Sequence, residues 1–107
     1  MQQISPPELA AWLADNGREP PLLLDVREPW EHEKARIEGA RLVPMRELPA
    51  RLDEIAKDRH VVAVCHHGGR SLQVAMFLEK NGYDKVHNLA GGVDAWSRTV
   101  DPAVPLY

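Results

Sequence analysis

The chain of 107 residues contains one cysteine, Cys65, and therefore has no partner for an internal disulfide bond. It lacks any apolar run near the roughly 20 residues that a bilayer-spanning helix needs. Folding signals begin at once from Ile4, which predicts that no signal peptide is present. The chain also lacks an excess of one charge, since a net charge of −3 gives no electrostatic reason to bind nucleic acid or an anionic membrane. We expect one domain in a reducing, cytoplasmic compartment, without nucleic-acid or membrane partners.

Short apolar runs alternate with helical patterns along the chain. Four runs are typical of strands, at residues 22–26, 41–44, 61–64 and 86–89. Four patterns are typical of helices or helix starts, at residues 5–17, 48–55, 71–81 and 91–96. The alternation predicts an α/β fold with a central parallel sheet and helices on both faces of that sheet.

The same patterns predict how the segments pack. The helix over 71–81 is apolar on most sides, so we expect it to be packed deep. The segment 100–107 contains two prolines, and we expect it to run as an extended coil over the surface of a core of about residues 4–99. We expect the three tryptophans to pack in the core or to cover its edge: Trp12, Trp30 and Trp96.

Cys65 holds the position from which a cysteine can react. A lone cysteine is often an inert core residue, but this one follows a buried strand and precedes two glycines, Gly68 and Gly69, and then a helix. Ligands of open α/β sheets bind beyond the carboxyl ends of the strands. Glycines allow a tight loop, and a helix N-terminus attracts anions, so a thiol there is expected to ionise readily and act as a nucleophile.

Four segments, taken in order, resemble the successive signatures of a single-domain rhodanese, a sulfurtransferase. They are Leu24–Glu31, Ile37–Ala40, Cys65–Arg70 and Leu89–Trp96. The resemblance runs from Ile4 to about Trp96 and implies a rhodanese-like domain over residues 1–107. One departure stands out, because the chain has Ala35-Arg36 where family members usually carry Gly-His.

The family implies a two-step reaction through a persulfide on Cys65. A donor such as thiosulfate supplies sulfur, and a thiol, cyanide or a protein acceptor removes it, with no cofactor and no metal. Backbone N–H groups of the loop from His66 to Ser71 are expected to hold the anions. Two rivals stay open. One is a sulfur carrier or interaction module that serves a protein partner, and the other is a small phosphatase or arsenate reductase on the same scaffold.

Loop length bears on the second rival. Four residues separate Cys65 from Arg70, whereas related phosphatase domains have five between cysteine and arginine. The smaller ring suits a terminal sulfur better than a tetrahedral phosphate group, so the resemblance favours sulfur transfer over dephosphorylation.

The other charged residues near the loop each carry two interpretations. Arg70 either holds the anionic group of the donor or pairs with a carboxylate such as Asp25 or Glu28. Asp25 and Arg27, at the end of the neighbouring strand, either support the loop or form a structural salt bridge.

The side chains of the two loop histidines also have two possible roles. His66 and His67 either line the entrance or act on anionic donors when charged. A metal site formed by Cys65, His66 and His67 is not expected, because adjacent residues rarely converge on one zinc ion.

Overall fold

The computed structural model describes all residues from 1 to 107 and contains one five-stranded sheet. The strands are β1 (Gln2–Ile4), β2 (Leu22–Asp25), β3 (Arg41–Leu42), β4 (Val61–Val64) and β5 (Val86–Leu89). All pairings are parallel, in the order β1-β5-β4-β2-β3. β4 lies in the middle because all four of its residues are apolar and buried, as a strand covered on both faces requires.

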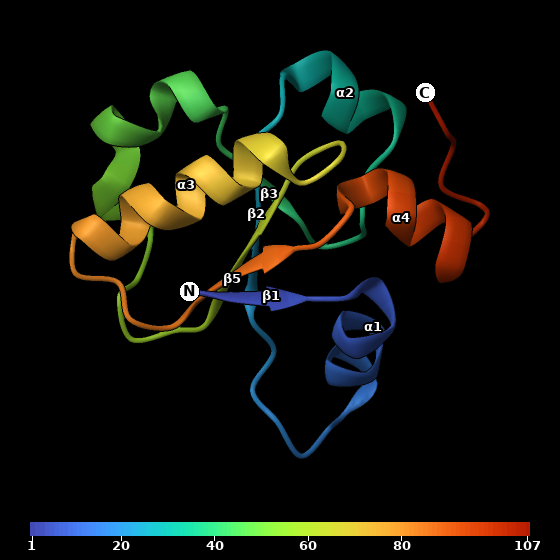
Figure 1. Cartoon of the computed structure of the whole chain (residues 1–107), viewed down its shortest axis with the longest axis horizontal. Coiled ribbons are helices and arrows are strands. Elements are labelled where there is room, and N and C mark those ends of the chain that lie inside the picture. The colour runs from blue at the N-terminus through green and yellow to red at the C-terminus, as the bar shows by residue number, and fades with distance from the viewer.

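Helices cover both faces of this sheet (Figure 1). They are α1 (Pro6–Ala14), α2 (Pro29–Lys34), the 3₁₀ helix η1 (Met45–Glu54), α3 (Gly69–Lys80) and α4 (Gly92–Thr99). α3 and η1 pack on one face and α1 and α4 on the other, and each face has its own cluster of buried apolar side chains. The predicted α/β class with a parallel sheet between helices is confirmed. No helix combines the length and the apolar character that a membrane crossing requires.

Two helix starts follow the same local rule. Ser5 caps α1 by accepting from the Glu8 N–H, while the Glu8 side chain accepts from the Ser5 N–H. Glu28 and Glu31 form the corresponding box at α2, again with proline in the first turn. α2 was not predicted, because a six-residue helix with one large apolar residue shows no periodicity.

Four expectations need correction. α3 is half-buried rather than packed deep, since Met76 is 56% exposed. Trp30 is 60% exposed and lies outside the core, whereas the other two tryptophans are buried. The third strand ends at Leu42, before the proline that lacks a ladder donor. The segment after α4 forms turns instead of running extended over the surface, because Val104 enters the core.

Two substitutions on α3 test this half-buried packing. Leu78 is fully buried, so Leu78→Ala should lower the free energy of unfolding by about 2–5 kcal/mol. Met76→Ala, two residues away on the exposed side, should change it by no more than about 0.5 kcal/mol. Urea unfolding followed by circular dichroism measures both, and equal losses in the two variants would contradict the packing described.

Candidate functional site

Cys65 leaves the central strand β4 and begins a loop that ends in the first turn of α3. The loop reverses at Gly68, whose φ of 104° lies in the left-handed region that side chains with a Cβ avoid. Gly69 has no such requirement, because a Cβ built there meets nothing within 4 Å. The structure therefore places the predicted nucleophile at the carboxyl edge of the sheet and assigns the tight turn to one of the two glycines.

The sulfur of Cys65 sits inside its own loop. It accepts from the Gly68 N–H at 3.0 Å and lies 3.2 Å from the hydroxyl oxygen of Ser71. Ser71 also donates to Oδ1 of Asn88, whose amide nitrogen donates to the Gly68 carbonyl at 3.3 Å. A hydroxyl has one proton, so Ser71 serves either the sulfur or Asn88 at any moment. Cys65 is 1% exposed, which leaves a narrow approach to the sulfur.

The start of α4 fixes the orientation of the loop peptides. The Val93 N–H donates to the Cys65 carbonyl at 2.9 Å, and the Asp94 N–H donates to the His66 carbonyl at 3.1 Å. In a trans peptide the N–H points opposite to the carbonyl, so the N–H groups of His66 and His67 point away from α4. Neither donates to another backbone group. The first-turn N–H groups of α3 likewise lack helical acceptors, so the loop offers several free donors.

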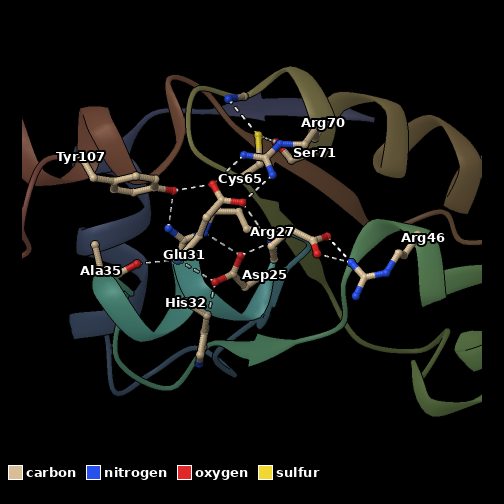
Figure 2. Close-up of polar contacts among 12 residues, drawn as sticks. Asp25, Arg27, Glu31, His32, Ala35, Arg46, Cys65, Arg70, Ser71 and Tyr107 are labelled. Atoms are coloured by element: carbon tan, nitrogen blue, oxygen red, sulfur yellow. Dashed lines mark hydrogen bonds and ion pairs between the residues drawn. The ribbon is translucent and has the colours of Figure 1, made fainter.

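Arg70 is held by Glu31 (Figure 2). Its Nη1 donates to Oε1 at 2.7 Å and its Nη2 to Oε2 at 2.9 Å, an end-on bidentate pair. The hydrogen bonds from Arg70 hold the pKa of Glu31 at about 2, and in turn raise the pKa of Arg70. The guanidinium keeps three of its five N–H groups, on Nε and the outer sides of both Nη atoms, without a protein partner.

The two carboxylates named in advance as partners for Arg70 are engaged elsewhere. Asp25 binds Arg27, and Glu28 pairs with Arg46 at the surface. Both members of the first pair are buried: Nε of Arg27 donates to Oδ1 of Asp25 at 2.9 Å and Nη2 to Oδ2 at 2.8 Å. This geometry corresponds to the structural salt bridge that was one of the two interpretations of these residues.

The buried pair is also tied to α2. His32 Nδ1 lies 2.9 Å from Oδ2 of Asp25. The carbonyl of Ala35 accepts from Arg27. Arg36, the second residue of the family departure, is exposed and its Nη1 donates to the His32 carbonyl, while the Ala35 N–H donates to the Glu31 carbonyl.

Tyr107 reaches the site from the far end of the chain. Its hydroxyl accepts from Nη1 of Arg27 at 2.7 Å and donates to Oε2 of Glu31 at 2.8 Å. Burial raises the pKa of Tyr107 to about 12. Its ring stacks on the imidazole of His66, with 3.8 Å between centroids and 9° between planes.

The two histidines of the loop differ in their surroundings. His66 is packed between Tyr107 and His67, its Nε2 is buried without a partner, and burial lowers its pKa. His67 is mostly exposed. The structure groups His66 and His67 with Asp94 rather than with Cys65, their ligand atoms lying within 4.8 Å of one another. Asp94 is already paired with Arg98 at 3.0 Å.

Three residues of the site were missed by sequence reasoning. Glu31 had a signal, because Glu28-Pro29-Trp30-Glu31 repeats the proline and glutamate placement of the first helix start. Asn88 lies in a strand that looked purely structural, and Tyr107 in a segment expected to be an extended surface coil. Nothing local to either residue indicates the loop that it contacts.

Comparisons with known proteins agree with one another. The sequence model of the family described as "Rhodanese-like domain" matches residues 5–99. A sulfurtransferase of Allochromatium vinosum is 41% identical over 104 residues, covering 97% of this chain and 95% of that protein. The putative sulfur carrier protein YrkF of Bacillus subtilis is 37% identical over 75 residues, covering 70% of this chain and 40% of that protein. The crystal structure of a rhodanese-like domain protein from Staphylococcus aureus superposes with a TM-score of 0.85 at 33% identity, covering 100% of this chain and 99% of that one.

A glycine pair tests how α4 holds the loop. A Cβ at Gly92 would lie 2.3 Å from the Cys65 carbonyl oxygen, and φ there is +62°. Gly92→Ala should therefore lower the free energy of unfolding by at least about 2 kcal/mol and displace the loop. Gly69→Ala should leave it unchanged or raise it by up to about 1 kcal/mol. Thermal unfolding measures both variants, and a tolerated Gly92→Ala would refute the close approach of α4.

Proposed function

The chain belongs to the rhodanese-like domain family, and on that premise we propose that it moves sulfane sulfur from thiosulfate, or a similar donor, to a thiophilic acceptor through a persulfide on Cys65. One observation carries the proposal. The Cys65 sulfur accepts from the Gly68 N–H within a loop whose other N–H groups have no backbone acceptor, with the Arg70 guanidinium at the far end of that loop.

The first step forms one sulfur–sulfur bond and breaks another. The Cys65 thiolate attacks the outer sulfur of thiosulfate, and the bonding pair of the donor's S–S bond leaves with sulfite. In the second step an acceptor thiolate, or cyanide, attacks the outer persulfide sulfur, and Cys65 departs as thiolate. Negative charge is conserved in both steps, so the site's task is to stabilise anions rather than to move protons.

Backbone groups meet most of that demand. The Gly68 N–H already donates to the sulfur, and the N–H groups of His66, His67 and the first turn of α3 have no backbone acceptors, so we expect them to bind the outer sulfur. No organic cofactor or metal takes part in this scheme. In this scheme His66 and His67 contribute their backbone N–H groups and line the entrance, and burial lowers the pKa of His66, which favours its neutral form.

Arg70 has a separate role in this proposal. Two of its three free N–H groups, on Nε and on the outer side of Nη2, lie parallel on one edge and fit two oxygens of a sulfonate-like group. Pairing with Glu31 and binding of the donor are compatible, since they use different edges of the guanidinium. The Asp25–Arg27 salt bridge contacts the loop only through Tyr107, whose ring stacks on His66, and does not touch the donor in this proposal.

A sulfur carrier is the second candidate. Cys65 is 1% exposed, which favours an acceptor that inserts a flexible segment, and a relative at 37% identity is named a putative sulfur carrier. Both candidates need the persulfide and differ in whether small molecules suffice. The four residues between Cys65 and Arg70 support either one over a phosphatase or arsenate reductase. The Cys65 thiol must stay reduced, so we place the reaction in a reducing compartment such as the cytoplasm.

Intact mass tests the persulfide directly. After incubation with thiosulfate, the protein should gain one sulfur atom, about 32 Da, and cyanide should remove it, because Cys65 is the nucleophile. Cys65→Ser is the control and should gain nothing while keeping its circular dichroism spectrum. No gain on the parent protein refutes thiosulfate as the donor and puts the carrier first. Turnover of an aryl phosphate would overturn the sulfurtransferase proposal.

Steady-state kinetics test Arg70. Arg70→Ala should raise the KM for thiosulfate roughly 10- to 100-fold, the effect of losing charged hydrogen bonds, while the attack of cyanide on the persulfide keeps its rate. Arg41→Ala is the matched control, because Arg41 pairs with Glu54 at the surface. If both half-reactions slow equally in Arg70→Ala, its role is to shape the loop.

A further inference from the structure

We propose that Tyr107 is a positioning residue for sulfur transfer: its hydroxyl joins two ion pairs and fixes the edge of Arg70 that faces an anionic donor. The two pairs are Asp25–Arg27 and Glu31–Arg70. The inference rests on the proposed function and adds a residue that neither the loop sequence nor the helix after it contains.

The direction of the hydroxyl proton is settled by its partners. Arg27 offers only donors and the Glu31 carboxylate only acceptors, so the Tyr107 oxygen must accept from the first and donate to the second. The low pKa of Glu31 keeps that carboxylate ionised throughout the neutral range. The Tyr107 hydroxyl thus bridges the two ion pairs with one fixed direction of its proton, and Figure 2 shows it between them.

One end of the bridge is immobile. Arg27 is 0% exposed, and its guanidinium is held by Asp25 and by the carbonyl of Ala35. Its remaining nitrogen, Nη1, is the one that meets Tyr107. A buried cation with each of its nitrogens engaged cannot follow a moving partner, so it serves as an anchor.

The other end controls the carboxylate of Glu31. Oε1 accepts from Arg70 and from the Glu28 N–H at 3.0 Å, and Oε2 accepts from Arg70 and from Tyr107. Each oxygen therefore has two donors, which fixes both the position and the plane of the carboxylate. Because Arg70 is bound end-on, its guanidinium takes its orientation from that plane.

Ring contacts keep the bridge in register with the loop. The Tyr107 ring stacks on His66 and meets the edge of Trp30 at 5.8 Å between centroids. The phenol is therefore held from two sides by apolar contact while its oxygen makes both polar contacts. Removing the hydroxyl alone leaves the stack in place and isolates the bridge.

The experiment compares two variants of the full chain in which a tyrosine loses only its hydroxyl group. Tyr107→Phe removes the bridge, and Tyr83→Phe removes a buried hydroxyl whose one proton is donated to the carbonyl of Leu52 or Ile55, outside the contacts of the site. We expect Tyr107→Phe to raise the KM for thiosulfate about 3- to 10-fold, the value of the one hydrogen bond to Glu31 through which Tyr107 acts on Arg70, with an unchanged rate for cyanide. Tyr83→Phe should leave both constants unchanged and serves as the measure of lost stability.

Two further measurements distinguish a specific effect on the orientation of Arg70 from general damage to the structure. With a neutral organic polysulfide as donor, Tyr107→Phe should keep the parent KM, because no sulfonate contacts Arg70. In the Arg70→Ala background, Tyr107→Phe should add no further rise in the KM for thiosulfate, because Tyr107 acts through Arg70. Additive effects in that double variant, or equal losses with both donors, would overturn the inference.

Measurements on the parent protein separate a failure of the proposed function from a failure of the proposed role of Tyr107. If it forms no persulfide from thiosulfate, the proposed donor is wrong and the inference falls with it. If it turns over thiosulfate while Tyr107→Phe behaves as Tyr83→Phe does, the proposed function stands and the role of Tyr107 is refuted.

Discussion

The buried guanidinium of Arg27 is the constraint on which this side of the site depends. A fully buried cation is tolerated only when its charge is paired and its donors are satisfied. Asp25, the Ala35 carbonyl and Tyr107 meet that requirement from a strand end, a helix end and the segment after the last helix. Satisfying one cation therefore brings together three parts of the chain. Tyr107 also donates to Glu31, which pairs with Arg70 at the end of the loop.

The other side of the site depends on backbone geometry. α4 takes up the carbonyls of Cys65 and His66, which it can do only because Gly92 lets the two backbones approach without a Cβ. Because those carbonyls point toward α4, the N–H groups of the same peptides point away from α4. The Gly91-Gly92 pair at the start of α4 thus shapes the proposed anion site although it would touch no substrate.

The sequence alone was enough to locate features that depend on residues close together in the chain. The buried run Val61–Val64 and the glycines after it placed Cys65 at the carboxyl edge of a parallel sheet, because strand burial and turn chemistry depend on neighbours in the chain. It failed where partners lie far apart. Glu31 meets Arg70 across 39 residues, and Tyr107 meets Glu31 across 76. No periodicity or spacing encodes such pairs, and a segment with two prolines gives no sign that its aromatic residue is packed against a loop.

The charge balance of the site explains why stabilisation of an anion depends on the N–H groups of the loop. Arg27 is neutralised by Asp25 and Arg70 by Glu31, while burial lowers the pKa of His66 and favours its neutral form. The ionised side chains beside the sulfur therefore cancel in pairs, and stabilisation of the proposed thiolate or persulfide would fall to oriented N–H groups. Backbone donors do not titrate, so this stabilisation persists over a wide pH range. Arg70 contributes through the geometry of its free N–H edge more than through net charge, which is why its orientation, and the residues that set it, matter to the chemistry.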